Sequence, residues 1–191
     1  MLQDEYDFLN QPTLSIKEDV RFFSTKVKYD LLDVNRNIVG FIKDEVYTFP
    51  FNLLKLTKLK FYQKSCLLYL SKDEELLFKV NRISRWRWRW HVTDTTNIIL
   101  GKILLGISFG CNPKINIDIK GQNDTSIMAI HGFHYTRDFT VRNESHQMIG
   151  IIKLISSSHI HTTFEKECTL NERKLMLAVA ICLSYYYQQK G

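Results

Sequence analysis

Three segments of the chain share one arrangement of apolar, polar and glycine positions. In each segment an aromatic residue lies four positions before an Asp or Asn, and an aliphatic residue lies two positions before it. A glycine follows seven positions after the Asp or Asn, and an isoleucine follows two positions after the glycine. The three segments are Tyr29–Ile42, Trp90–Ile103 and Phe139–Ile152.

This repeated arrangement predicts a β-hairpin in each segment. Apolar residues at alternate positions place one face of a strand in a core. The Asp or Asn starts the turn, because its short side chain bonds to nearby backbone and tolerates turn geometry. We expect the glycine where a side chain would crowd a neighbour or where a bulge bends the strand, and the isoleucine back in the core.

Other stretches predict further strands by the same alternation, and about ten to twelve short strands result, which is typical of an all-β barrel or sandwich. Phe49–Tyr62 fits both the helical and the strand period, and we favour a strand there. The remaining predicted strands are Cys66–Leu70, Leu76–Val80, Ile115–Lys120, Ile127–Ile130 and Phe133–Tyr135.

The last part of the chain breaks this pattern and predicts a helix over residues 170–187. Thr169 and Glu172 have the spacing of a capping box, and Leu175–Leu183 is apolar on every side. The apolar run is shorter than the ~20 residues that cross a bilayer. We therefore expect the helix inside a β-barrel. Its expected core residues are Leu175, Leu177, Val179, Ile181 and Leu183.

The chain resembles the tubby C-terminal-like superfamily, in particular its LURP-one-related and small bacterial members and, more distantly, the phospholipid scramblases. The resemblance rests on Val92-Thr-Asp94 followed by Gly101-Lys-Ile103, on Ile115–Gly121, and on the apolar stretch Leu175–Tyr187. It extends roughly from Arg21 to Gln188. It implies a mainly β fold, a closed antiparallel barrel of about twelve strands that encloses a hydrophobic C-terminal helix.

The domain organisation expected is a single domain, because no linker rich in Pro, Gly or Ser divides the chain. Residues 1–20 are expected to be an N-terminal extension and residues 21–191 the barrel. The first residues are acidic and polar and show neither a secretory signal nor a myristoylation glycine. The four cysteines lack close spacing, which is typical of reduced thiols. Both observations predict a cytoplasmic protein.

The net charge of +6 favours anionic partners. The stretch from Arg85 to Trp90 alternates Arg and Trp, so a strand there would direct the tryptophans to the core and the arginines to solvent. Such arginines can form a solvated face or contact phosphates; nucleic acid is disfavoured, because it would need exposed aromatic rings. The candidate residues for phosphate contact are Arg85, Arg87, Arg89, Lys58 and Lys60.

Candidate catalytic and metal-binding groups are sparse. Histidines come in two pairs, His131 with His134 and His159 with His161, and the second pair would share one face of a strand, a spacing that metal sites use. No group of cysteines or carboxylates accompanies either pair. No spacing places a base beside a cysteine, and no phosphate-binding or hydrolase motif occurs. We therefore expect no cofactor, no metal and no enzymatic activity.

The function expected is that of a non-enzymatic tubby-like domain that binds anionic phospholipid headgroups at the cytosolic membrane face. The resemblance implies this, because tubby domains bind phosphoinositides and scramblases act at membranes. Before the helix only Glu165 and Glu167 stand where scramblases have an acidic stretch, so calcium-dependent scrambling is not expected. The alternative is a soluble protein-interaction or scaffold domain without lipid binding.

Overall fold

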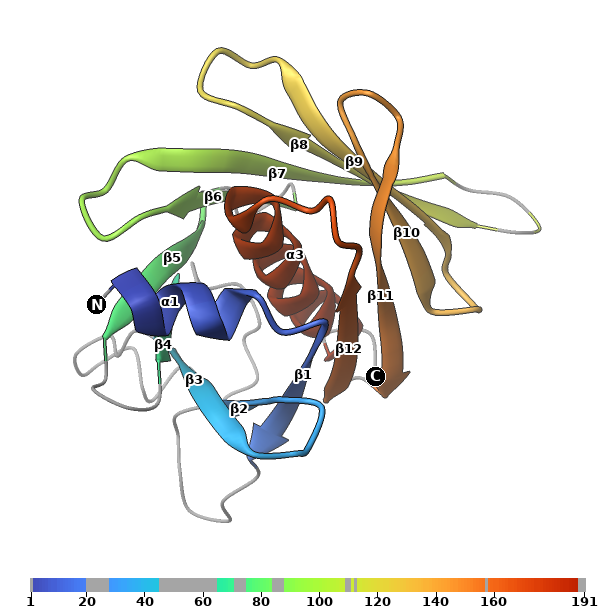
Figure 1. Ribbon diagram of the computed structural model, residues 1–191. Coiled ribbons are helices and arrows are strands. Elements are labelled where there is room, and N and C mark those ends of the chain that lie inside the picture. Colours follow the sequence, from blue (N-terminus) through green and yellow to red (C-terminus); the bar gives the residue numbers. More distant parts are fainter. Residues whose placement is uncertain are drawn as a thin grey trace, which may run out of the picture.

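The chain forms a closed barrel of twelve antiparallel strands around a central helix (Figure 1). The computed structural model describes residues 2–19, 28–44, 65–70, 75–83, 88–108, 111, 113–156 and 158–188. The elements are α1 (Leu2–Leu9), β1 (Thr13–Asp19), β2 (Lys28–Leu32), β3 (Ile38–Asp44), β4 (Ser65–Leu70), β5 (Leu76–Arg82), β6 (Arg89–Thr93), β7 (Ile99–Ile107), β8 (Lys114–Lys120), β9 (Ser126–Phe133), β10 (Asp138–Asn143), β11 (Met148–Ser156), β12 (His159–Phe164) and α3 (Leu170–Gln188). This confirms the predicted fold class.

Strands follow one another around the barrel in chain order, and β1 closes the ring by pairing with both β2 and β12. Residues 13–19, which we expected in an N-terminal extension, therefore belong to the barrel, and the barrel begins before residue 21. The two strands predicted at 127–130 and 133–135 are one strand, β9, followed by a turn. Phe49–Tyr62 lies outside the described residues.

The three repeated segments form the hairpins β2–β3, β6–β7 and β10–β11 with one shared register. The aromatic residue pairs with the isoleucine in every hairpin, and the aliphatic residue pairs with the glycine. Both residues of each pair face the core, and a one-residue bulge follows the second pair. The pairs are Tyr29 with Ile42 and Leu31 with Gly40, Trp90 with Ile103 and Val92 with Gly101, and Phe139 with Ile152 and Val141 with Gly150.

The turns of these hairpins are also alike. In the first, the Arg36 amide donates to the Asp33 carbonyl and the Asp33 amide donates to the Asn37 carbonyl. Arg36 has a positive φ of 67°, and the corresponding residues of the other two hairpins, Asn97 and His146, have positive φ of 65° and 60°. A carboxylate oxygen of Asp33 also accepts a hydrogen bond of 2.7 Å from the Asn37 backbone amide. The Asp or Asn is thus required as an acceptor for the backbone that returns from the turn.

Two of the repeated glycines let the central helix approach the barrel wall. A Cβ atom on Gly101 would lie 2.7 Å from a Leu175 methyl group, and one on Gly150 would lie 2.5 Å from the Met176 methyl group. Carbon atoms cannot approach so closely without displacement. The glycines are therefore the positions at which α3 meets β7 and β11.

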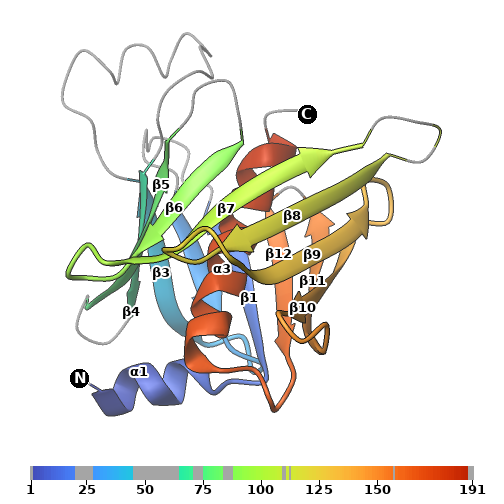
Figure 2. The ribbon, with the colours of Figure 1, turned by 90° about the horizontal axis from the view of Figure 1, so that it is seen from above.

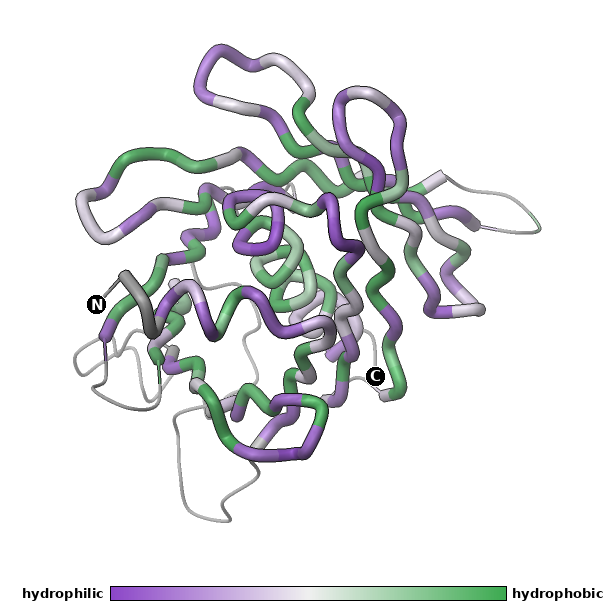
Figure 3. The backbone as a smooth tube through the Cα atoms, viewed as in Figure 1, coloured by the Kyte–Doolittle hydropathy of each residue, from purple (hydrophilic) through white to green (hydrophobic). Residues whose placement is uncertain are grey.

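Helix α3 crosses the interior of the barrel, and its middle is hydrophobic on every face (Figures 2 and 3). Its five expected core residues are each no more than 2% exposed. The predicted capping box is present, because the Thr169 amide donates to the Glu172 carboxylate at 2.7 Å and the Glu172 amide donates to the Thr169 hydroxyl at 3.3 Å. Those bonds satisfy backbone donors at the exposed start of the helix.

Buried Arg173 fastens the start of α3 to the N-terminal residues. Its guanidinium donates to the carbonyls of Leu9 at 2.6 Å, Gln11 at 3.0 Å and Cys168 at 3.1 Å. Lys174 forms an ion pair with Glu5 of α1. These bonds hold α1 across the end of the barrel at which α3 begins, as Figure 1 shows.

The other end of the barrel, at which α3 finishes, is called the C-terminal end of the barrel below. Tyr185, Tyr186 and Tyr187 lie there, and each contacts a different part of the wall. Tyr185 accepts a hydrogen bond from Cys66 of β4, and Tyr187 donates to the His134 carbonyl. Strands β3 and β5 finish at this end, and strands β4 and β6 begin there (Figure 2).

Candidate functional site

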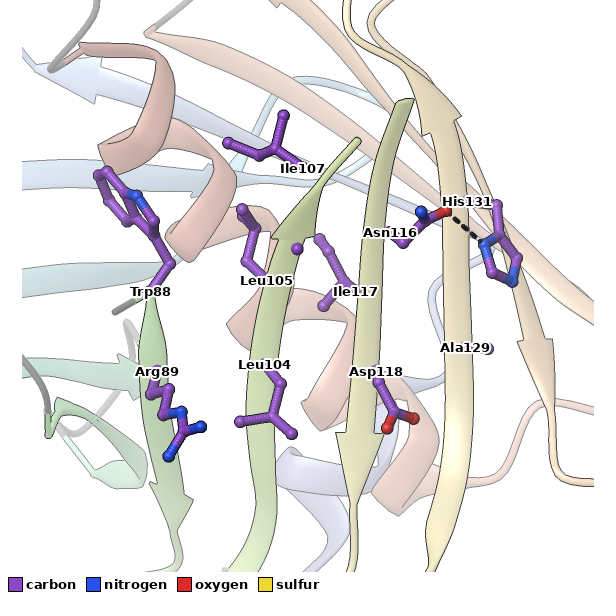
Figure 4. Close-up of a pocket in the computed structure, with 11 residues that line it drawn as sticks. Trp88, Arg89, Leu104, Leu105, Ile107, Asn116, Ile117, Asp118, Ala129 and His131 are labelled. Carbon is purple, nitrogen blue, oxygen red and sulfur yellow. Dashed lines mark hydrogen bonds between the residues drawn. The ribbon is translucent and has the colours of Figure 1, made fainter. Parts of the chain in front are cut away.

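A groove of about 770 Å³ lies along strands β7, β8 and β9 beside the start of β6. On the outward face, Leu104 pairs with Arg89 on one side and with Asp118 on the other. Figure 4 shows the two charged side chains flanking Leu104. Ala129 continues the same row beyond Asp118. The groove therefore has an apolar floor, with one cation and one carboxylate beside it.

Three polar side chains of the groove, Asn116, Asp118 and His131, have hydrogen-bond partners in the protein. His131 shares a hydrogen bond of 2.9 Å with the Asn116 side chain, drawn as a dashed line in Figure 4. The Ser126 hydroxyl donates to Asp118 at 2.6 Å. The side chains of Asn116, Asp118 and His131 are thus held by hydrogen bonds to neighbouring strands.

One hydroxyl–imidazole pair does occur on the outer surface of the barrel. Ser15 of β1 and His161 of β12 share a hydrogen bond of 2.9 Å. Burial, followed by the nearby charge of Lys153, lowers the pKa of His161. A histidine that acts as a general base becomes a cation as it takes the proton, and an adjacent lysine opposes that charge. The surroundings of this pair therefore disfavour its use as a nucleophile and base.

The second pair of histidines predicted from the sequence does share one face of a strand. The rings of His159 and His161 lie 4.7 Å apart on the outside of β12. Burial lowers the pKa of His159, and the charge of His161 lowers it further. Within the described part of the chain, no group of three or more His, Cys, Asp or Glu residues could hold a metal ion. His159 and His161 thus form a partly buried pair without a third ligand among those residues.

At the C-terminal end of the barrel, aromatic rings surround a buried arginine. Trp88 packs edge-on against Tyr186 with ring centroids 5.1 Å apart, and its ring lies 5.7 Å from that of Trp90. The Arg82 guanidinium lies over the Trp88 ring at 4.6 Å. Trp88 also lines the groove, so it separates the groove from this inner cluster.

The phosphate-contact residues predicted from the sequence are described only in part. Arg89 is exposed at the start of β6, whereas Trp88 is partly buried and Trp90 is 3% exposed, as the alternation of Arg and Trp predicts. Four other candidates lie outside the described residues: Arg85, Arg87, Lys58 and Lys60.

Arg82 is the residue of this end that sequence reasoning missed. Phe78, Val80 and Arg82 alternate along β5 and all face inward, and Arg82 pairs with Trp90. The predicted strand stopped at Val80, because a cation is not expected in a core. Extending the period-two pattern by one step would have placed Arg82 inside the barrel.

Comparison with known proteins supports the fold. The chain is similar to the X-ray structure of the Arabidopsis thaliana protein AT5G01750, with 13% sequence identity and a TM-score of 0.51, over 90% of this chain and 89% of that chain. That protein is LURP-one-related and tubby-like. The chain therefore has the tubby-like fold, a twelve-stranded barrel with a C-terminal helix. No protein-family model and no curated protein matches the sequence.

Proposed function

We propose that this protein is a non-enzymatic binding module for anionic phospholipid headgroups at the cytosolic face of a membrane. Arg85, Arg87 and Arg89 would make the main contacts, together with Lys58 and Lys60. Arginine suits this role because its planar fork of N–H donors matches phosphate oxygens. Within the described residues, no helix is long and apolar enough to cross a bilayer. The contact proposed is therefore with the membrane surface.

The observation that carries the proposal is the position of the strand ends that flank the basic segments. Residues 45–64 connect β3 to β4, and residues 83–88 connect β5 to β6. These four strands are neighbours in the barrel, and both connections join strand ends at its C-terminal end. Arg89 is exposed at the same end. The described strand ends that flank both basic segments thus lie at one end of the barrel, which supports a common contact surface for their cations.

Exposed aromatic residues at this end also support membrane contact. Tyr135 is 71% exposed in the turn after β9, and Phe133 is 45% exposed. The Lys114 ammonium lies 5.3 Å from the centre of the Phe133 ring. Aromatic rings beside cations are typical of surfaces that sit at the level of lipid headgroups.

Vesicle flotation tests the proposal. We expect the protein to float with vesicles that contain phosphatidylserine or phosphoinositides and to stay behind with phosphatidylcholine vesicles. Replacing Arg85, Arg87 and Arg89 with Gln should weaken binding roughly 100-fold, because each cation near an anionic surface contributes about 1 kcal/mol. Equal and negligible binding to both kinds of vesicle would contradict the proposal.

A control variant with the same net charge separates position from overall charge. Lys120, Arg142 and Lys166 lie toward the other end of the barrel, outside the proposed contact. Replacing these three with Gln should change vesicle binding much less than the triple arginine variant. If both variants weaken binding equally, net charge and not the C-terminal end determines the binding.

The groove favours a second candidate function, a protein-interaction domain. Its apolar floor between Arg89 and Asp118 is suited to a protein segment that carries both charges. A pull-down that loses its partner when Arg89 and Asp118 are both reversed, in a protein that does not float with anionic vesicles, would support this candidate over lipid binding.

A further inference from the structure

Arg82 is a buried cation whose Nε atom lacks an acceptor among the described residues. Its side chain faces the barrel interior, and only 8% of the residue is exposed. Buried arginines in folded proteins are normally paired with carboxylates or carbonyl oxygens. Arg173 of the same chain, with its carbonyl partners, is an example.

The ring of Trp88 does not replace such an acceptor. The guanidinium carbon of Arg82 lies over the ring, 4.6 Å from the ring centroid. The contact of an N–H group with an aromatic ring is weaker than a hydrogen bond to an oxygen atom. The ring therefore helps to hold the guanidinium and leaves its hydrogen bonds to be made by another group.

The surroundings of Arg82 favour its interaction with a negative group. Burial lowers the pKa of Arg82, so a charge of opposite sign would be stabilising there. Trp90 on the neighbouring strand and Tyr186 beyond Trp88 provide apolar walls. In such a site an arginine–anion contact is stronger than in water.

We propose that Arg82, held by Trp88, is the anchor of an anion site inside the C-terminal end of the barrel, and that the site takes one phosphate group. The phosphate belongs to a small soluble phosphate or to a lipid headgroup. This site is separate from Arg89 of the proposed function, because Arg82 and Arg89 point to opposite sides of the wall.

Thermal unfolding and calorimetry with inorganic phosphate test the site. We expect phosphate to raise the unfolding midpoint of the whole chain above its value in chloride at equal ionic strength. In Arg82→Met this difference should vanish, and phosphate affinity should fall about 10- to 100-fold, the range for a hydrogen bond to a charged group. Lys120→Gln, toward the other end of the barrel, should keep the response, and it also corrects for the general stabilising effect of phosphate salts.

Stability without phosphate gives a second, independent result. Arg82→Met removes an unpaired buried charge, so its midpoint in chloride should equal or exceed that of the unaltered protein. A clear fall would show that the guanidinium already has partners in the protein, and would overturn the proposal. A phosphate response that persists in Arg82→Met, or that is absent from the unaltered protein, would also overturn it.

Vesicles distinguish the two sources of phosphate. If the ligand is a lipid headgroup, Arg82→Met should bind phosphatidic acid vesicles more weakly than the unaltered protein does. If the ligand is a soluble phosphate, Arg82→Met should bind these vesicles normally while its response to inorganic phosphate is lost. If instead the proposed function is wrong and the phosphate site is right, the protein should not bind vesicles but should keep its response to inorganic phosphate.

Discussion

At the scale of single residues, burial determines which cysteine can react. Cys111 is exposed, whereas Cys66, Cys168 and Cys182 are buried. Burial, with a smaller contribution from Glu172, raises the pKa of Cys168 to about 12. Burial also raises the pKa of Cys182 well above its usual value. The thiolate is the reactive form of cysteine. Cys168 and Cys182 are therefore protected from reaction in two ways, because reagents cannot reach the buried sulfur atoms and because the raised pKa keeps the thiols protonated.

Alkylation with iodoacetamide at about pH 8, near the ordinary thiol pKa, checks this difference. Mass spectrometry should find Cys111 modified rapidly in the folded protein and the three buried cysteines modified only after denaturant is added. Cys111→Ser should remove the rapid reaction. Fast modification of Cys168 in the native protein would contradict the burial seen at the start of α3.

At the scale of elements, the start of α3 depends on a side chain that bonds the helix backbone. Thr169 accepts from the Glu172 amide, and Glu172 accepts from the Thr169 amide and hydroxyl. The free amides at a helix start otherwise bond only to water. This reciprocal pair also fixes the point at which the chain leaves the wall and enters the barrel.

Thr169→Ala should lower the free energy of unfolding by about 1 kcal/mol, the usual effect of removing an N-cap side chain. Urea denaturation followed by circular dichroism measures this change. Thr125 provides a matched control, because it is an exposed threonine that does not begin a helix and can be replaced with Ala in the same way. Thr125→Ala should have little effect, and similar losses in both variants would show that the cap is not the cause.

Some elements follow from sequence patterns and others depend on tertiary contacts. The hairpins and α3 were predictable, because alternation, turn residues and the capping box all lie within short segments. The helix α1 was not, because its few apolar residues give a weak local signal. Phe8 and Leu9 are buried by contacts with parts of the chain that are distant in sequence: the Phe8 ring lies beside Gly40 of β3, and Arg173 of α3 donates to the Leu9 carbonyl.

The candidate site, like the fold, could be predicted from the sequence only in part. The alternation of Arg and Trp placed Arg89 outside and Trp90 inside. The groove could not be foreseen, because it depends on the register of Leu104 with Arg89 and Asp118 on separate strands. The register between separate strands depends on contacts throughout the barrel, so it cannot be predicted from the sequence of any one segment.

At the scale of the whole molecule, barrel and helix each provide what the other lacks. The inner faces of the strands need an apolar occupant, and α3, apolar on all sides, needs to be surrounded. Leu177 lies at the centre of this arrangement and is 0% exposed. The whole core therefore depends on the middle of one helix.

Leu177→Asp should prevent folding. An unpaired carboxylate at this position costs several kcal/mol, comparable with the 5–15 kcal/mol that typically stabilises a whole domain. Expression in the soluble fraction and near-ultraviolet circular dichroism report the outcome. Asn171→Asp, on the exposed first turn of α3, introduces the same group and should fold normally. A soluble and folded Leu177→Asp protein would be incompatible with an enclosed helix.

The closed ring also has a consequence for the order in which the protein is made. Strand β1 is synthesised early but pairs with β12, and α3 follows all twelve strands in the chain. While the ribosome is still adding residues, the strands can form hairpins but have nothing to enclose. Their apolar faces remain open to chaperones and to neighbouring nascent chains until α3 emerges. The protein thus completes its fold only after its central element, the last of the barrel to be translated, is released.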